Sequence, residues 1–193
     1  MSETGDTTPP ELTAWQRNWL RELDAYAIRH VDEAASIAQF RDFMQRHADA
    51  AERELAIGHL TGAAWLVSGD GRRVLLTHHR KLQRWLQLGG HADGDVDLVA
   101  VALREAEEES GLRELTIEPD VFDLDCHWIP DHGGVPGHWH YDLRYVVQCC
   151  GDEQFAVSEE SLALAWRDIA AMVGSPDYDE SLQRMARKWL ARA

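Results

Sequence analysis

Three glutamates carry the clearest chemical signal in this sequence. Glu105, Glu108 and Glu109 are three and four residues apart within a predicted helix at 97–110, so their carboxylates share one face of that helix. At separations of about 5–6 Å and an effective dielectric constant of about 20, each pair of carboxylates repels by about 3 kcal/mol. A divalent cation relieves this repulsion, and Mg²⁺ prefers carboxylate, water and phosphate oxygens. A solvated acidic helix face is the alternative interpretation.

The residues just before this helix suit the same chemistry. Gly89 and Gly90 have no side chains, so their backbone can approach a ligand closely and offer amide or carbonyl groups. His91 follows them directly and is a candidate for contact with substrate or water.

Basic side chains elsewhere are further candidates for substrate contacts. His138 and His140 alternate with apolar residues on a predicted strand, so they lie on its polar face. With His127 they could form a zinc site, but their spacing is not diagnostic, and we favour contacts with a substrate phosphate or ribose. Arg80 belongs to a cationic turn that either binds phosphate or is simply exposed.

Caps and hydrophobic spacing predict the elements that position these residues. Asp97 is a typical N-cap and Gly111 a typical left-handed C-cap of the glutamate-bearing helix. Asp179 is the predicted N-cap of a final helix. The sequence predicts a hairpin of 62–67 and 72–78 and further strands at 85–88, 121–129, 138–149 and 162–166. Strands and helices mix without regular alternation, so we expect an α+β fold with a mixed sheet.

The N-terminal part of the chain has a different pattern. Residues 1–9 are a polar tail, and 10–56 are a predicted helical extension that includes a short helix at about 48–55. Its apolar stripe must be covered, either by a second copy of the chain in a homodimer or by the chain's own sheet. Residues 57–193 are expected to form the main domain with its C-terminal helix.

Composition narrows the class of partner. The 193 residues include 34 acidic and 19 basic side chains, for a formal net charge of −15. Such a chain repels nucleic acid and anionic membranes, and no apolar run is long enough to span a bilayer. The N-terminus shows no secretory signal. The number of cysteines, three, is odd, which indicates reduced thiols. We therefore expect a cytoplasmic protein that acts on a small molecule.

The segment 90–112 resembles the Nudix box, a long motif of glycine, arginine and glutamate at fixed spacing. Val96 departs from it, because the box has a glutamate there. The matching positions are Gly90, Arg104, Glu105, Ala106, Glu108, Glu109, Gly111 and Leu112. The resemblance extends over about 60–172 and implies an α/β/α Nudix sandwich, with the N-terminal helices outside it.

This resemblance implies a hydrolase that cleaves the pyrophosphate bond of a nucleoside diphosphate linked to another moiety. It implies that Glu105, Glu108 and Glu109 hold Mg²⁺ or Mn²⁺, together with the carbonyl group of Gly89 or Gly90.

The general base is left open by the resemblance. It comes either from the box helix, where Glu105 is the candidate, or from a later loop, where Glu159 and Glu160 are the candidates.

The resemblance also implies that Arg104 braces the box helix by pairing with glutamates. Val96 cannot accept that hydrogen bond, so we expect Asp95 or Asp97 to replace the missing glutamate.

Two other functions are alternatives. A non-hydrolytic nucleotide sensor would agree with the departure at Val96, but all three box glutamates are retained. An isomerase of the isopentenyl-diphosphate type shares the fold, but its box is usually degraded. The sequence does not specify which nucleoside diphosphate derivative is bound, because loops outside the box select it.

Overall fold

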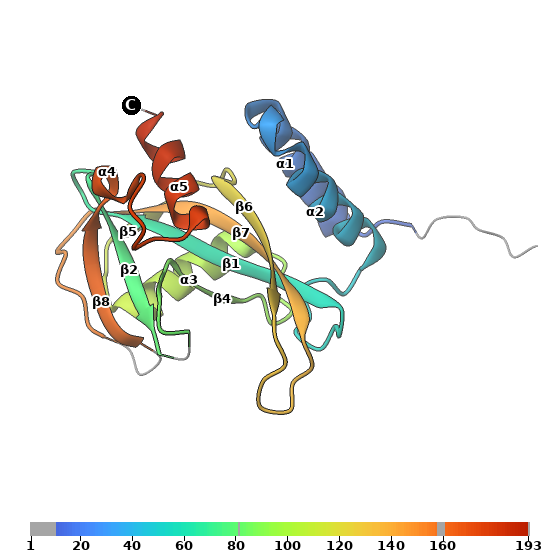
Figure 1. Cartoon of the computed structure of the whole chain (residues 1–193). Helices are drawn as coiled ribbons and strands as arrows, with labels where there is room; N and C mark the ends of the chain where they lie inside the picture. Colours follow the sequence, from blue (N-terminus) through green and yellow to red (C-terminus); the bar gives the residue numbers. More distant parts are fainter. Residues whose placement is uncertain (1–10, 81, 158–160, 193) are drawn as a thin grey trace, which may run out of the picture.

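The computed structural model describes residues 11–80, 82–157 and 161–192. The strands in these ranges form one mixed sheet with helices on both faces (Figure 1). In chain order the elements are α1 (Ala14–Arg29), η1 (Val31–Glu33), α2 (Ala34–Arg46), β1 (Gly58–Val67), β2 (Arg73–His79), β3 (Trp85–Leu86), β4 (Leu88–His91), α3 (Leu98–Ser110), β5 (Leu115–Ile117), β6 (Asp123–Ile129), β7 (His138–Cys149), β8 (Ser161–Asp168), α4 (Ile169–Met172) and α5 (Glu180–Leu190). No helix in the described ranges is long and apolar enough to span a bilayer.

Strand β1 lies at the centre of the sheet. It pairs in parallel with β7, from Gly58 beside Trp139 to Val67 beside Gln148. It also pairs antiparallel with β2, which confirms the predicted hairpin, and with β4. The sheet is completed by antiparallel pairs of β7 with β5 and β6 and of β2 with β3 and β8.

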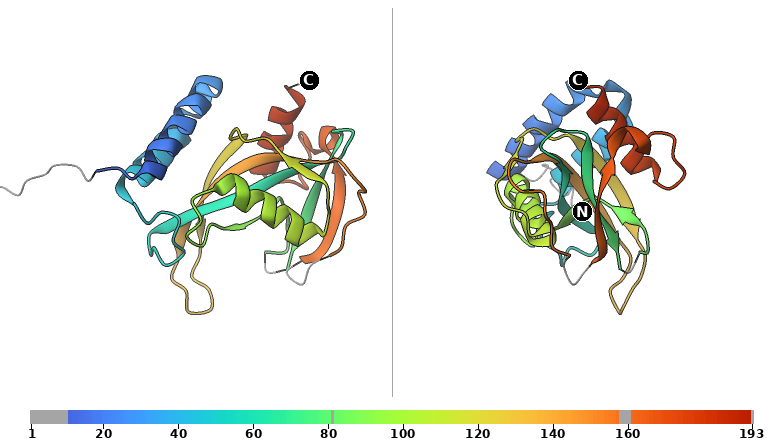
Figure 2. Two further views of the ribbon diagram at one scale, coloured as in Figure 1. Left: turned by 180° about the vertical axis from the view of Figure 1, so that it is seen from behind. Right: turned by 90° about the vertical axis from the view of Figure 1, so that its left-hand side faces the viewer.

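Alternate residues of β1 pack against helices on opposite faces of the sheet. Ala64 and Leu66 belong to a core cluster with Ala106 of α3. Trp65 and Val67 belong to a second cluster with residues of α4 and α5. Because both faces of β1 are covered, its sequence is an apolar run rather than an alternating one. Figure 2 shows the resulting order of helix, sheet and helix, so the expected α/β/α sandwich is confirmed.

The caps of the two longest helices in the main domain are confirmed. The Asp97 carboxylate accepts a hydrogen bond from the backbone N–H of Ala100 at 3.0 Å, and Gly111 ends α3 with a φ of +70°. The Asp179 carboxylate caps α5 by accepting from the backbone N–H of Leu182 at 3.0 Å. Local signals alone therefore locate the glutamate-bearing helix.

The N-terminal extension packs on the chain's own sheet. Phe43 of α2 stacks on Tyr141 of β7 with ring centroids 3.8 Å apart, and Phe40 meets the same ring edge-on at 5.4 Å. The indole N–H of Trp19 in α1 donates to the carbonyl oxygen of Val96 at 3.0 Å. Of the two expected ways to cover the apolar stripe, the structure shows the intramolecular one.

Two local predictions were wrong, and two short elements were missed. The expected helix at 48–55 is a series of turns, because the carbonyl groups of Ala50 and Ala51 accept from the backbone N–H groups of Leu60 and Gly94 at 2.8 and 2.9 Å instead of from a helix. The expected strand 85–88 is divided between β3 and β4. β5 and α4 were not predicted, since segments of three or four residues give little periodic signal.

A buried ion cluster joins β6, β7 and α5. The fully buried Asp123 accepts from Arg144 at 3.1 Å, from Arg184 Nε at 2.9 Å and from Lys188 Nζ at 2.6 Å. Arg144 is only 2% exposed and also donates to Asp142 at 3.1 Å. Burial raises the pKa of Asp123, but the surrounding cations outweigh burial and hold that pKa below its ordinary value.

Candidate functional site

The glutamate-bearing face of α3 lies against β4. A Cβ atom built on Gly90 would lie 2.5 Å from Oε2 of Glu105, so the carboxylate occupies the space that a side chain at 90 would need. The backbone N–H of Gly89 donates to Oε2 of Glu109 at 3.2 Å. The two glycines thus allow the backbone of β4 to contact two carboxylates of α3.

The third glutamate, Glu108, is exposed on the same helix. The structure does not bring the oxygens of Glu105, Glu108 and Glu109 into one close group of ligands. This donor set nevertheless fits Mg²⁺, which takes oxygen ligands only, is bound through one or two carboxylates and keeps several waters.

Arg104 pairs with Asp95, one of the two aspartates expected to replace the missing glutamate. The distance between the guanidinium and the carboxylate is 3.4 Å. The Asp95 carboxylate also accepts from the backbone N–H of Asp97 at 3.0 Å. The paired side chains are 42% and 40% exposed, so this contact contributes less than about 1 kcal/mol to stability. The contact links the loop between β4 and α3 to the helix itself.

Three histidines converge from three adjacent strands. His59 of β1 lies in register with His140 of β7, and His91 of β4 lies opposite Thr61, two residues along β1. One ring nitrogen or the other of each histidine lies within 4.8 Å of a ring nitrogen of the other two. We call His59, His91 and His140 the histidine triad. It adjoins the glutamate site, because His91 directly follows Gly90.

His59 is the member of the triad that sequence reasoning missed. It is 2% exposed, and neither of its ring nitrogens has a hydrogen-bond partner among the described residues. Leaving a buried polar group unpaired costs about 1–3 kcal/mol. The sequence offers one indication of its role, because the imidazole of His59 interrupts the mostly apolar residues of β1.

The triad is held in its neutral form. Burial, together with the neighbouring His91 and His138, lowers the pKa of His59 to about 4. Burial and the surrounding histidines hold the pKa of His140 well below its ordinary value, and burial with Arg53 lowers the pKa of His91. At neutral pH each ring therefore keeps one unprotonated nitrogen.

Two further histidines border the triad. His138 Nε2 lies 3.3 Å from Nε2 of His140, and its Nδ1 lies 2.9 Å from the carbonyl oxygen of Pro136. His127 Nδ1 lies 3.1 Å from a carboxylate oxygen of Asp125. Burial lowers the pKa of His127, but the hydrogen bond to Asp125 and the negative charges of Asp142 and Asp125 together outweigh burial and raise that pKa. The structure thus brings together His91, His138 and His140, three of the four expected substrate contacts.

The remaining predicted residues are Arg80, in the described ranges, and two glutamates outside them. Arg80, the fourth expected substrate contact, is exposed at the turn after β2, where its carbonyl oxygen accepts from Gln83 at 2.6 Å. Glu159 and Glu160, the loop candidates for the general base, lie outside the described residues.

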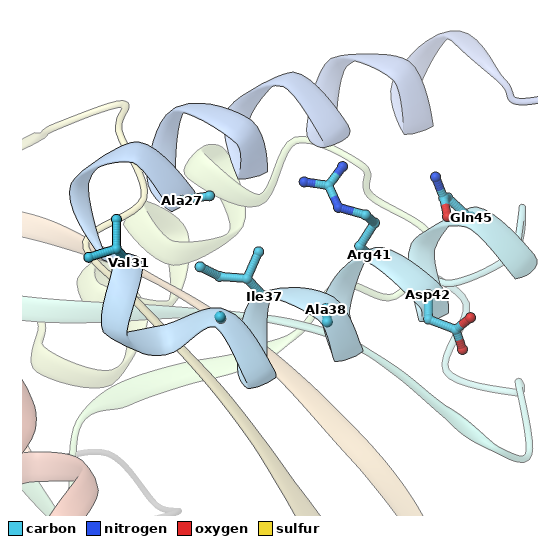
Figure 3. Close-up of a pocket in the computed structure, with 8 residues that line it drawn as sticks. Ala27, Val31, Ile37, Ala38, Arg41, Asp42 and Gln45 are labelled. Carbon is cyan, nitrogen blue, oxygen red and sulfur yellow. The ribbon is translucent and has the colours of Figure 1, made fainter.

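A hollow of about 590 Å³ lies between the N-terminal helices (Figure 3). It is lined by Ala27, Val31, Ala34, Ile37, Ala38, Arg41, Asp42 and Gln45. None of these residues belongs to the glutamate face of α3 or to the histidine triad. We therefore place the candidate site at β4 and α3, where the chemistry-bearing side chains meet, and not in this hollow.

Comparison with models of protein families assigns this fold to a family. The family model described as the NUDIX domain matches residues 58–190, which is more than half of the chain and includes the whole box. The chain belongs to the Nudix family. Within this Nudix domain the box comprises the end of β4, the loop that carries Asp95, and α3.

Solved Nudix structures share this fold. An Ap4A hydrolase of C. elegans is 20% identical with a TM-score of 0.55, and the match covers 69% of this chain and 96% of that one. A NUDIX-family hydrolase of Clostridium perfringens is 20% identical with a TM-score of 0.55, over 70% and 98% of the two chains. The dihydroneopterin triphosphate pyrophosphohydrolase of E. coli is 19% identical with a TM-score of 0.55, over 69% and 96%. A search of the curated proteins finds no significant match. At these identities the likeness establishes the Nudix fold alone.

Proposed function

We propose that this Nudix protein is a hydrolase that uses Mg²⁺ or Mn²⁺ to cleave the pyrophosphate bond of a nucleoside diphosphate linked to another moiety. The observation that carries the proposal is the contact of the Glu105 and Glu109 carboxylates with the glycines of β4. Family membership supports it, since structural neighbours such as the Ap4A hydrolase act on nucleotide pyrophosphates.

The cation ligands in this proposal are the box carboxylates and a backbone oxygen. Glu105, Glu108 and Glu109 would hold the cation with the carbonyl group of Gly90. When bound, the cation neutralises the charge of the pyrophosphate and polarises its phosphoryl oxygens. Arg104 and Asp95 keep the preceding loop in place, so that Gly90 and α3 hold their relative positions.

A carboxylate of this chain removes a proton from the attacking water. Glu105 is the candidate on the box helix, because its carboxylate already lies against the backbone of β4. Glu159 and Glu160 are the alternatives from the later loop. A single-turnover pH profile of each glutamine variant would assign the base.

Substrate contacts are proposed for the basic residues around this site. His91 ends β4 directly after Gly90, and His138 and His140 lie at the start of β7. These three histidines would donate to a phosphate or ribose oxygen. Arg80 would contact a phosphate from the turn after β2. The substrate is a small molecule and not nucleic acid, since the net charge of −15 repels polyanions. The three free cysteines favour a reducing compartment such as the cytoplasm.

The proposed function is tested with a matched pair of variants on one helix. Glu108→Gln removes a proposed cation ligand, whereas Glu107→Gln changes a glutamate that points away from the shared face. Sugar nucleotides, dinucleotides and nucleoside triphosphates are assayed with Mg²⁺ and with Mn²⁺. We expect the wild type to cleave at least one class, Glu108→Gln to lower kcat by about 100-fold or more, and Glu107→Gln to leave kcat unchanged.

Two results would contradict the proposal. Undiminished turnover in Glu108→Gln would refute the cation assignment. Tight nucleotide binding by calorimetry, without any Mg²⁺-dependent or Mn²⁺-dependent product, would instead favour the sensor function.

A further inference from the structure

We infer that the histidine triad, His59, His91 and His140, is a binding site for one transition-metal ion of the zinc class, separate from the box glutamates. Ring nitrogens of the three side chains lie within 4.8 Å of one another. They come from β1, β4 and β7, which are joined by backbone pairing, so the rigid sheet fixes their relative positions.

The burial of His59 is the first independent support. His59 is only 2% exposed, and neither of its ring nitrogens has a hydrogen-bond partner among the described residues. Buried polar groups are nearly always paired, so an unpaired histidine beside two other histidines indicates a missing partner. A metal ion supplies that partner, because it binds the unprotonated nitrogen of a neutral imidazole.

The chemistry of the donors selects the class of ion. Three imidazole nitrogens suit zinc and related transition metals, whereas Mg²⁺ takes oxygen ligands. Zinc–nitrogen bonds of about 2.0–2.1 Å place tetrahedral ligands about 3.3 Å apart, so ring nitrogens that now lie within 4.8 Å of one another would approach by about 1.5 Å or less through side-chain rotation.

The triad has an outer contact of the kind that metal-binding histidines usually have. His138 contacts His140 and is itself held by the carbonyl oxygen of Pro136. Such outer contacts orient a metal ligand and fix its ring. Three protein ligands would leave a fourth tetrahedral position for water or an anionic group.

The experiment measures zinc binding to the full chain in the presence of excess Mg²⁺, which occupies oxygen sites. Metal-free protein is titrated with Zn²⁺ by calorimetry, and Co²⁺ is added to a second sample to record its visible absorption. The matched variants are His91→Gln and His140→Gln in the triad and His132→Gln on the exposed 131–137 loop. Circular dichroism checks that each variant is folded, and either triad variant alone suffices if the other does not fold.

We expect one equivalent of Zn²⁺ to bind the wild type and to raise its Tm. Each triad variant should weaken binding by about 100-fold or more, since even an outer-shell partner is worth about 10–100-fold in affinity. Glu108→Gln should leave zinc affinity unchanged, so failure of this proposal and failure of the proposed hydrolase function are distinguishable. Wild-type affinity no higher than that of the folded triad variants, or equal loss in His132→Gln, would overturn the inference.

Discussion

At the scale of single residues, Gly90 is the position where the backbone of β4 meets a carboxylate of α3. Its missing side chain is what lets the Glu105 carboxylate approach the strand. The φ of Gly90 is not among the positive values in this chain, so its role is to provide space and not to adopt a strained backbone conformation.

Gly90→Ala should therefore damage activity more than stability. The new Cβ would push aside the flexible end of Glu105, so the free energy of unfolding should change by less than about 1 kcal/mol. Displacing a reacting carboxylate by about 1 Å should lower kcat by about 100-fold. Both quantities are measured by urea unfolding and by assay of the best substrate.

Gly174→Ala is a control for which we expect the opposite result, a loss of stability without a loss of activity. Its φ is +80° with open space around it, so alanine should cost about 1 kcal/mol of stability or more and leave kcat intact. Equal losses of activity in the two variants would show that alanine at 90 acts only through stability.

At the scale of elements, α1 and α2 behave as part of the main core. Phe43 and Phe40 share the ring of Tyr141, and Trp19 bonds to the loop that precedes α3. Packing the extension is thus coupled to the position of the box.

Phe43→Ala should destabilise the whole chain by about 3–5 kcal/mol, because it removes a buried aromatic ring from the interface with β7. Ile28→Ala, on the same extension but 81% exposed, should change stability by less than about 0.5 kcal/mol. Urea unfolding followed by tryptophan fluorescence measures both. A similarly small effect of both substitutions would indicate that the extension contributes nothing to folding of the sheet.

At the scale of the whole molecule, the ion cluster around Asp123 joins parts that are far apart in the chain. Lys188 of α5 reaches Asp123 of β6 at 2.6 Å and Tyr26 of α1 at 2.6 Å. Arg144 of β7 is buried at the centre of this cluster. Removing one partner of such a buried group leaves the opposite charges uncompensated.

Asp123→Asn should destabilise the protein by about 3–5 kcal/mol at neutral pH, because Arg144, Arg184 and Lys188 lose the buried carboxylate that all three share. Asp177→Asn, a change at an exposed aspartate, is the matched control and should have little effect. Chemical unfolding at pH 7 compares the two. A loss below about 1 kcal/mol in Asp123→Asn would show that the remaining carboxylates compensate Arg144.

The same cluster predicts acid sensitivity. Cations hold the folded-state pKa values of Asp123 and Asp125 below the ordinary 3.8, although burial opposes this. The unfolded chain then binds more protons below pH 3.8, so the stability that is fully present above this pH is lost as the pH falls further. Unfolding free energies measured between pH 7 and about pH 2 should fall with increasing slope below pH 3.8, and less steeply in Asp123→Asn. Parallel curves would contradict the prediction.

Much of the candidate site follows from local sequence. Asp97 and Gly111 bound α3 because caps act on neighbouring backbone groups, and helical spacing alone places Glu105, Glu108 and Glu109 on one face. The contact of Arg104 with Asp95 is one of the two alternatives predicted from the sequence, because Asp95 and Asp97 flank Val96 in the chain.

The sequence by itself determined the box helix, the two glycines that precede it and the family to which they belong. Only the tertiary structure decided that His59 meets His140, because the parallel pairing of β1 with β7 is set by packing between distant segments and leaves no local signal. The same holds for the turns at 48–55, where backbone groups of β1 and of the loop before α3 take the hydrogen bonds that a helix would have used.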